Sequence, residues 1–338
     1  MKTLKFGLIG LGFWPREAYV PILRELDTAE VVAVSAASEA TRQFACEQFG
    51  ESLKTYPDYH DLLADDAVEA VMLALPHALY PQALPAALAS GKHVFCEPPL
   101  SHIPAEIANM LALMDASTKV VQLDLELRYL PVVEAVKNLL DSGSVGRPLM
   151  SKVRLACDWR RGVIEKQNEN ENEGFFPWVA AWYLDLLDCV FSQPPARASV
   201  TGDYAAAAHM MDHGFATLEF DGGGIGQFEF FLLGSKEVSI TLDILAEGGE
   251  IQADIPSGKW QWRKTNEPFQ QEHNPASLPA HGFEGMRECI TSFVDAALNN
   301  TPVLADVDVA RRIHAGIVAC MLSERAGHTV EVGRFLET

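Results

Sequence analysis

The first 123 residues alternate short apolar runs with stretches of helical periodicity, and this alternation most narrowly limits the fold of the chain. Runs that are apolar throughout suit parallel strands buried on both faces. We expect strands at 4–9, 31–34, near Tyr56, and at 70–75, 93–96 and 120–123. Helices are expected at 19–26, around 44–49, and at 81–90 and 104–115. The alternation predicts an α/β fold, a doubly wound parallel sheet with right-handed crossovers.

The turn Gly10-Leu11-Gly12 stands directly after the first expected strand and before a helix. Gly10 would permit a tight turn, Gly12 would let the backbone approach a pyrophosphate, and the helix amino terminus would supply N–H donors. This context predicts a dinucleotide site. We expect Phe13 and Trp14 to lie at the cofactor, and Pro15, at the third glycine position, to be the first helical residue.

The end of the second strand reads Val34-Ser35-Ala36-Ala37-Ser38 and contains no carboxylate to bind an adenosine ribose. We expect Ser35, Ser38 and Arg42 to contact the cofactor there. Small hydroxyl residues and a nearby arginine tolerate a 2′-phosphate better than an acid does, which favours NADP(H) over NAD(H). The alternative is a neutral strand end in a domain that binds no nucleotide.

After Arg147-Pro148 the pattern changes to strands with polar interruptions and a hairpin signal at 221–224. These strands are expected at 149–157, 198–204, 214–220, 225–233, 237–245 and 250–255, and helices at 281–298 and 306–327. The pattern predicts a second, α+β domain with a large, mostly antiparallel sheet. We place the Rossmann domain at 1–123 and the substrate and oligomerisation domain at 124–338.

Composition excludes several classes of partner. The chain has 26 basic and 46 acidic residues, a formal net charge of −20, so the attraction that drives binding to phosphate backbones is absent. We expect neither nucleic acid nor a membrane as partner, but a small molecule. The six cysteines are scattered and predict buried free thiols in a protein of the cytoplasm. His209, Asp212 and His213 fall in an expected loop, and we expect no metal.

Several segments resemble those of one oxidoreductase family. Gly91-Lys92-His93-Val94-Phe95-Cys96-Glu97-Pro98-Pro99-Leu100 resembles the GKHVxxEKPL motif of the Gfo/Idh/MocA oxidoreductases. Residues 74–77 are similar to their ATPN or ATPH turn, 127–131 to NxRxxP, and 142–148 to SGxIGxP. The pattern from Asp306 to Val332 matches their closing helix and strand. The resemblance covers nearly the whole chain and implies a Rossmann domain, then a domain whose open sheet forms a homodimer or homotetramer.

The resemblance also implies site residues. Leu75, Pro76 and His77 match the family turn at the cofactor, and Glu97 and Pro98 match the EKP motif. The family's catalytic lysine, however, is Pro98 here, which neither transfers a proton nor donates a hydrogen bond.

The family motif DxGxHxxD aligns with Ala181-Trp182-Tyr183-Leu184-Asp185-Leu186-Leu187-Asp188 and retains only its last aspartate. Both usual proton-transfer residues are therefore missing.

Asp185, at the family histidine position, is the first candidate for the acid/base. An isolated aspartate has a pKa near ~3.9, so burial or the like charge of Asp188 would have to raise it. The alternative is that Asp185 caps a helix or forms a salt bridge. Tyr183 and Tyr129 could donate a phenolic proton to the substrate. The alternative is that both are packing residues. His77 either takes part in the chemistry or only touches the cofactor.

The remaining candidates concern the substrate. Arg128 either holds an anionic substrate or forms a structural ion pair. Tyr129, Trp178, Trp182 and Asp188 are expected at the substrate site, and the aromatic side chains among them fit a core equally well.

The leading hypothesis is an NAD(P)-dependent oxidoreductase that transfers a hydride to or from a sugar derivative or ring compound, with a non-standard acid/base. The alternative is a non-catalytic nucleotide or sugar sensor on the same fold.

Overall fold

The computed structural model describes residues 2–160, 175–206, 211–235, 237–276 and 285–332, and the chain divides into two compact units. The first comprises Met1–Glu126 with Leu278–Ala310, and the second Leu127–Ser277 with Arg311–Glu337. The predicted division at residue 123 places residues 285–310 in the second domain, whereas their contacts group them with the first unit.

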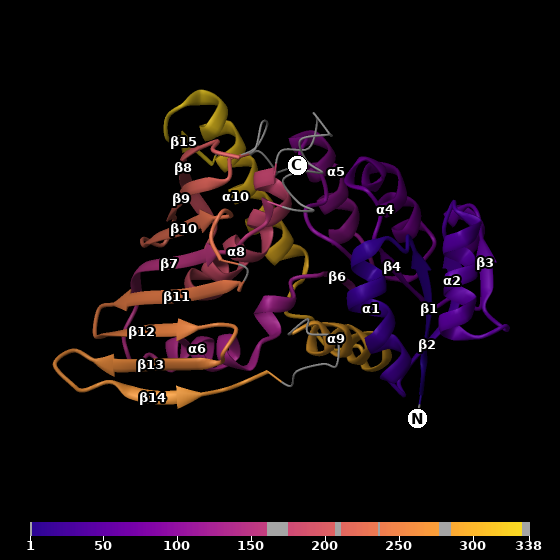
Figure 1. Cartoon of the computed structure of the whole chain (residues 1–338), viewed down its shortest axis with the longest axis horizontal. Helices are drawn as coiled ribbons and strands as arrows, with labels where there is room; N and C mark the ends of the chain where they lie inside the picture. Colours follow the sequence, from indigo (N-terminus) through magenta and orange to yellow (C-terminus); the bar gives the residue numbers. More distant parts are fainter. Residues whose placement is uncertain (1, 161–174, 207–210, 236, 277–284, 333–338) are drawn as a thin grey trace. The chain divides into compact units, whose positions relative to one another are not determined.

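Six strands form the parallel sheet of the first unit (Figure 1). They are β1 (Leu4–Ile9), β2 (Ala29–Ser35), β3 (Lys54–Tyr56), β4 (Ala70–Leu73), β5 (His93–Cys96) and β6 (Val121–Leu123). Their order is β3-β2-β1-β4-β5-β6, which confirms the predicted doubly wound sheet. Strands β2 and β3 follow on one side of β1, and β4 to β6 follow on its other side, so the strand order reverses between β1 and β4. In such sheets ligands bind outside the carboxyl ends of the strands at this reversal.

Helices cover both faces of this sheet. They are α1 (Phe13–Glu25), α2 (Glu39–Phe49), α3 (Tyr59–Leu63), α4 (Tyr80–Ala89), α5 (Pro104–Asp115) and α9 (Met286–Asn299), with the short 3₁₀ turn η1 (His77–Leu79). A second 3₁₀ turn, η2 (Glu126–Tyr129), spans the boundary between the two units. Helix α1 contacts α2 and α9, and α4 contacts α3 and α5. Right-handed crossovers leaving β1 and β4 in opposite directions place these two groups on opposite faces.

Helix α9, which is remote in sequence, completes the core of the first unit. The ring of Phe293 is fully buried, 6.0 Å from the Phe6 ring of β1 and 5.5 Å from the Phe95 ring of β5. Arg287 forms an ion pair with Glu25 of α1. The helix therefore belongs to this sheet as much as the crossover helices do.

Nine strands form the sheet of the second unit, and α6 (Pro131–Asp141), α8 (Phe175–Phe191) and most of α10 (Val307–Ala326) belong to the same unit. The strands are β7 (Pro148–Ala156), β8 (Pro195–Asp203), β9 (His213–Phe220), β10 (Ile225–Phe231), β11 (Ser239–Ala246), β12 (Gly249–Asp254), β13 (Lys259–Lys264), β14 (Gln270–His273) and β15 (Val330–Glu331). Among the strand pairs of this sheet in the described residues, β10 and β7 are parallel and the rest antiparallel, which confirms the predicted mostly antiparallel sheet.

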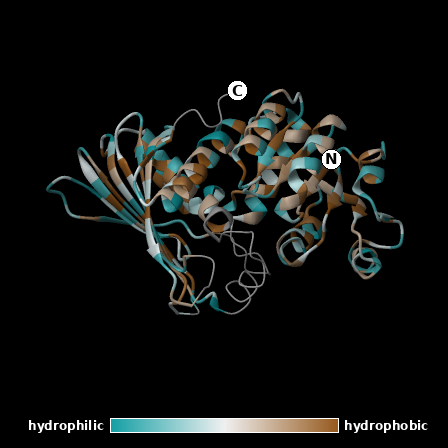
Figure 2. Ribbon diagram, turned by 90° about the horizontal axis from the view of Figure 1, so that it is seen from above, coloured by the Kyte–Doolittle hydropathy of each residue, from teal (hydrophilic) through white to brown (hydrophobic). Residues whose placement is uncertain are grey.

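One face of this sheet is apolar and packs on α8, which contacts β7 and β10. Leu155 and Phe230 are buried there, while Arg154 and Glu229 form an ion pair on the opposite face. Figure 2 shows the resulting alternation of hydrophobic and hydrophilic residues along the strands. The homodimer or homotetramer expected from the resemblance stays a prediction.

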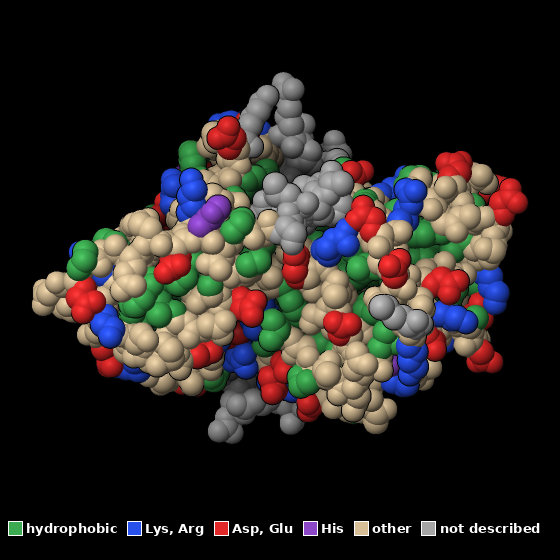
Figure 3. Space-filling view, turned by 90° about the horizontal axis from the view of Figure 1, so that it is seen from below, with side chains coloured by type: hydrophobic (Ala, Val, Ile, Leu, Met, Phe, Trp, Pro, Cys, Tyr) green, Lys and Arg blue, Asp and Glu red, His purple; other side chains and the backbone are tan. Residues whose placement is uncertain are grey.

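Charges of both signs are interspersed on the face of the molecule drawn in Figure 3. None of the helices in the described residues combines the length and the apolar character needed to cross a bilayer. All six cysteines are free, and five of them are buried.

Substituting Phe293→Ala should lower the free energy of unfolding by about 3–5 kcal/mol, because the cavity would open between α9, β1 and β5. Chemical denaturation of the full chain measures this change. The control Leu113→Ala, on the exposed side of α5, should stay within about 0.5 kcal/mol of the unsubstituted protein. Equal effects of the two substitutions would show that α9 does not contribute to this core.

Candidate functional site

The glycine turn follows β1 and packs against the carboxyl end of β4. Gly10 has a φ of +87°, and a methyl group placed on it would lie 2.2 Å from the carbonyl oxygen of Ala74. Gly12 has an ordinary φ of −74°, is exposed, and would have no atom within 4 Å of such a methyl group. Gly10 is thus required by the fold itself. Gly12 instead leaves open space in front of the first N–H groups of α1, as a bound pyrophosphate needs.

Pro15 does not have the predicted position. Helix α1 begins at Phe13 with Gly12 as its N-cap, so Pro15 is the third helical residue and not the first. The first N–H groups of a helix have no partner within it, and the missing proline N–H therefore costs no hydrogen bond at this position either. Phe13 is 75% exposed and Trp14 half-buried, so the ring of Phe13 is accessible to a ligand at the turn.

Arg16 holds the turn in place, and sequence reasoning missed it. Its Nε donates to the carbonyl of Leu11 at 2.9 Å, and Nη2 donates to the hydroxyl of Thr41 at 3.0 Å. The guanidinium lies 4.4 Å from the centre of the Phe44 ring of α2. The turn is therefore fastened to the helix that follows β2.

The residues expected at the adenosine ribose lie at the end of β2. Ser35 is buried, and Ser38 is the exposed N-cap residue of α2. Arg42 folds back over this loop, where its Nη1 donates to the carbonyls of Ala36 and Ala37 at 2.7 and 2.8 Å. A cation therefore lies beside a strand end that carries no carboxylate.

The end of β4 supplies the neighbouring side of the turn. Leu75 lies close to Gly10, since its Cδ2 would be 3.1 Å from a methyl group on that glycine. Pro76 is the N-cap residue of η1, and the half-buried ring of His77 lies 5.8 Å from that of Tyr80. The structure thus brings Leu75, Pro76 and His77 to the sheet edge that carries Gly10.

Glu97 enters a buried acidic cluster with two residues that sequence reasoning missed. The Tyr19 hydroxyl of α1 is hydrogen-bonded to Glu97 and lies 2.7 Å from Oδ2 of Asp124. Burial and then the charge of Asp124 raise the pKa of Glu97 well above its usual value. Burial raises the pKa of Asp124 to about 6, and it raises that of Tyr19 as well. Pro98, next to Glu97, is buried.

A second charge cluster lies in the second unit. Arg128 donates through Nε to both oxygens of Asp185, at 3.1 and 3.2 Å, and through Nη2 to Asp188 at 2.9 Å. Arg312, which sequence reasoning did not single out, donates to Asp188 at 2.6 and 3.0 Å. Asp185 is fully buried. Burial raises its pKa to about 6, although the charge of Arg128 opposes the shift.

This arrangement favours the salt-bridge alternative for Asp185 and the ion-pair alternative for Arg128. An enclosed carboxylate held by two guanidinium nitrogens offers no oxygen to a substrate. The structure therefore argues against Asp185 as the group in direct contact with a reacting hydroxyl. Asp188 is likewise engaged by two arginines.

The aromatic candidates divide between core and partly exposed positions. Tyr183 is buried, and its ring stacks on that of Phe228 at 4.8 Å with 7° between the planes. Tyr129 is also buried, whereas Trp182 is half-buried. The stacking favours a packing role for Tyr183. The side chain of Trp178 lies outside the described residues.

The expectation of no metal concerned residues near 209–213. His209 lies outside the described residues, and Asp212 accepts hydrogen bonds from the backbone N–H groups of Ala205 and Ala206. Within the described ranges no group of three or more histidine, cysteine, aspartate or glutamate side chains has an arrangement that could hold a metal ion.

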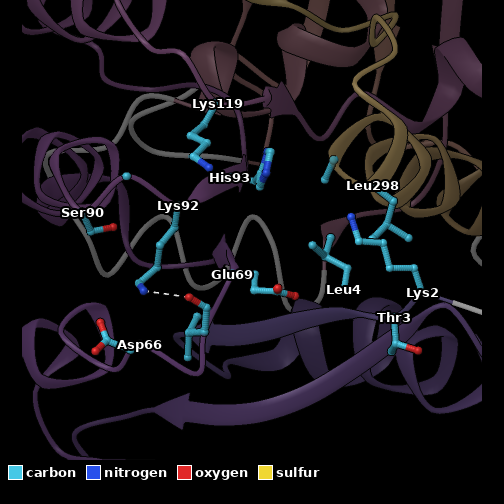
Figure 4. A pocket seen from close by; sticks show the side chains of 13 residues that line it. Lys2, Thr3, Leu4, Asp66, Glu69, Ser90, Lys92, His93, Lys119 and Leu298 are labelled. Atoms are coloured by element: carbon cyan, nitrogen blue, oxygen red, sulfur yellow. Dashed lines mark hydrogen bonds between the residues drawn. The ribbon is translucent and has the colours of Figure 1, made fainter.

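A cavity of about 330 Å³ lies at the opposite edge of the first sheet (Figure 4). Its walls include Leu4 and His93, the first residues of β1 and β5, so it adjoins the amino ends of these strands. The ammonium of Lys92 donates to the carbonyls of Asp65 and Val68 at 3.0 and 2.7 Å. This cavity is therefore separate from the glycine turn.

Comparison with known proteins identifies relatives of both parts. Residues 4–125 match the family described as "Oxidoreductase family, NAD-binding Rossmann fold", and residues 133–252 match the "GFO/IDH/MocA C-terminal domain". These matches confirm the resemblance seen in residues 91–100. They cover the chain in the order that the sequence motifs predicted.

Individual relatives are dehydrogenases. The chain is 33% identical over 149 residues to inositol 2-dehydrogenase of Salmonella paratyphi B, a match that spans only 44% of each protein. It is 29% identical to D-xylose 1-dehydrogenase [NADP(+)] of Haloarcula marismortui, over 90% of this chain and 86% of that one. A crystal structure of an oxidoreductase from Agrobacterium radiobacter, in complex with NAD+, L-tartaric acid and magnesium, has a TM-score of 0.87 at 17% identity. It covers 99% of this chain and 100% of that one, and shows the common fold.

Substituting Arg128→Met should lower the free energy of unfolding by about 3–5 kcal/mol, because it leaves the buried Asp185 carboxylate without its main partner. The double variant Arg128→Met/Asp185→Leu should lose less than the single one, since no unpaired charge remains. Urea denaturation measures both. As a control, Arg154→Met breaks a half-exposed pair and should cost about 1 kcal/mol or less. A double variant as unstable as Arg128→Met would contradict the ion-pair interpretation.

Proposed function

The chain belongs to the Gfo/Idh/MocA oxidoreductase family, and on that basis we propose that it is an NAD(P)-dependent dehydrogenase of a cyclic polyol or sugar. Inositol and D-xylose, named in the two relatives, are polyhydroxylated compounds of this class. The observation that carries the proposal is the glycine turn, where Gly12 leaves open space before the amino end of α1 at the reversal of strand order. A methyl group there would fill the space that a pyrophosphate requires.

The cofactor would be held by residues of the first unit alone. The amino end of α1 faces the pyrophosphate, Phe13 offers its exposed ring, and Arg42 with Ser38 stands where the adenosine ribose would bind. A bound nicotinamide dinucleotide supplies the acceptor or donor of the hydride. Arg42 beside a strand end without an acid favours NADP(H), which is also the cofactor in the name of the Haloarcula relative.

The residue that takes up the substrate proton has to be assigned anew, because Pro98 replaces the family lysine. Oxidation of a carbon bearing a hydroxyl releases a hydride to the nicotinamide and a proton that a side chain must take up. Asp185 and Tyr183 are enclosed by an ion pair and a ring stack. His77 is half-buried at the carboxyl end of β4, and an imidazole ring can both accept and donate a proton. We therefore assign the hydroxyl proton to His77.

A second candidate function is a non-catalytic nucleotide or sugar sensor. The observation that favours it is that both proton-transfer residues of the family are replaced. Proline stands in place of the lysine, and a buried, ion-paired aspartate stands in place of the histidine. A sensor would retain nucleotide binding and show no turnover.

The nucleotide site is tested by thermal unfolding with NADPH or NADH. Both should stabilise the protein, NADPH more strongly, and a ligand at 100 times its dissociation constant adds about 2.7 kcal/mol. Gly12→Ala should fold but lose the stabilisation by both nucleotides. Arg42→Ala should lose mainly the extra effect of NADPH. Gly10→Ala serves as contrast, because it should unfold at lower temperature without any ligand. If neither nucleotide stabilises the unsubstituted protein, the proposed function is wrong.

Turnover is tested by following the absorbance of reduced nicotinamide with inositols, pentoses and hexoses as substrates. His77→Ala should lower kcat by about 10²–10⁴-fold, the usual contribution of general acid/base catalysis, while the nucleotide-induced rise in Tm remains. His60→Ala, on the exposed surface of α3, is the control and should leave turnover unchanged. Nucleotide binding without turnover of any substrate would favour the sensor, and full activity of His77→Ala would refute the role of this residue.

A further inference from the structure

Two carboxyl side chains and a tyrosine hydroxyl, all from separate elements, meet at the carboxyl ends of β5 and β6. Glu97 follows β5, Asp124 follows β6, and Tyr19 comes from the second turn of α1. Tyr19 and Asp124 are fully buried, and Glu97 is 9% exposed. The cluster lies at the same edge of the sheet as the glycine turn, and the proposed hydride transfer does not use it.

The contacts within the cluster require a second proton in addition to that of the Tyr19 hydroxyl. The Tyr19 oxygen is within hydrogen-bond distance of Glu97 and of Asp124, but a hydroxyl has a single hydrogen to donate. Ionised carboxylates only accept hydrogen bonds. The second contact therefore needs a hydrogen on a carboxyl group. A hydrogen bond between Glu97 and Asp124 requires the same extra proton.

The proton belongs on Glu97. Burial and the charge of Asp124 raise the pKa of Glu97 well above its usual value. Burial raises the pKa of Asp124 only to about 6, because hydrogen bonds from the Tyr19 hydroxyl and the Cys289 thiol favour its ionised form. Two carboxylates that share a buried site repel each other when both are ionised, so one of them stays neutral.

The groups around the pair leave this assignment intact. Glu126, in η2, adds a further negative charge near Glu97. Tyr80 of α4 accepts from the Glu97 backbone N–H at 3.1 Å and donates to Leu73. Cys96 of β5 and Cys289 of α9 are buried thiols whose pKa burial raises, so both are neutral. The ionisable groups that act on the pair are thus acidic or uncharged.

We propose that neutral Glu97 is a positioning residue of the nucleotide site, and that its proton holds the amino end of α1 to the ends of β5 and β6. Asp124 accepts a hydrogen bond from Tyr19 in the second turn of α1, the turn that directly follows the first. The first turn carries the N–H groups that face the pyrophosphate. Loss of the Glu97 proton places two negative charges against this helix, so nucleotide affinity falls as the pH rises. The link to affinity rests on the proposed function.

The direction of the stability change follows from the raised pKa of Glu97. An unfolded glutamate has a pKa near ~4.3, so above that pH the folded chain binds one proton more than the unfolded chain. The stabilisation is complete below the unfolded pKa and is lost progressively as the pH rises to the folded pKa. Above the folded pKa, a single linked proton lowers nucleotide affinity by at most about tenfold per pH unit.

The test compares Glu97→Gln with Glu97→Ala. The glutamine amide keeps a donor and an acceptor without ionising, so it imitates the neutral carboxyl group. We expect Glu97→Gln to bind NADPH near neutral pH within about threefold of the unsubstituted protein and to lose the alkaline decline in affinity. Glu97→Ala should bind weakly at every pH. Glu47→Gln, at an exposed position of α2, should keep the original pH profile.

Two readouts need no nucleotide. An infrared band of a protonated carboxylic acid should be present in the unsubstituted protein at neutral pH and absent in Glu97→Gln. The Tm of the nucleotide-free protein should fall more with rising pH than that of Glu97→Gln. Absence of the band, or a Glu97→Gln variant that binds as weakly as Glu97→Ala, would overturn the proposal. If no variant binds nucleotide, the proposed function fails, and the band and the Tm still decide whether Glu97 holds the proton.

Discussion

The close approach of Gly10 to the carbonyl of Ala74 is the constraint on which the rest of the first unit depends. At this contact the end of β1 lies so close to the backbone of Ala74 that a methyl group on Gly10 would have no room. It fixes the start of α1, and with it the position of the exposed Gly12 and of the helix N–H groups. Arg16 then ties the turn to α2, so the turn is held by the end of β4 on one side and by α2 on the other.

The sequence predicts the elements of this chain better than it predicts their side-chain partners. Strands β1 and β4 are recognisable because burial on both faces makes them apolar throughout, and the family motifs follow the strand ends. Helix α3 has five residues, too few to show periodicity, and was missed. Tyr19 looks like an ordinary apolar-face residue because its partner Asp124 is 105 positions away. Such pairings arise only from the fold, and local patterns carry no trace of them.

The chain uses two different ways of burying carboxylates. In the second unit Asp185 and Asp188 are neutralised by Arg128 and Arg312, so the charges balance in pairs. In the first unit Glu97 and Asp124 meet with a tyrosine and no arginine among the contacts that link them, and a shared hydrogen takes the place of the cation. The first arrangement requires an ionised Asp185 and weakens as the pH falls toward its pKa of about 6, whereas the second requires a bound proton and weakens as the pH rises.

The contribution of α9 to the first sheet has a consequence for synthesis on the ribosome. Phe6 and Phe95 emerge from the exit tunnel long before Phe293, the ring that covers them. All six strands of the parallel sheet are therefore translated while part of their apolar face is still bare, and the whole of the second sheet up to β14 must follow first. Amino-terminal domains commonly fold as units during translation. Here the core of the first unit is completed only by a segment that is translated after strands β7 to β14 of the second sheet.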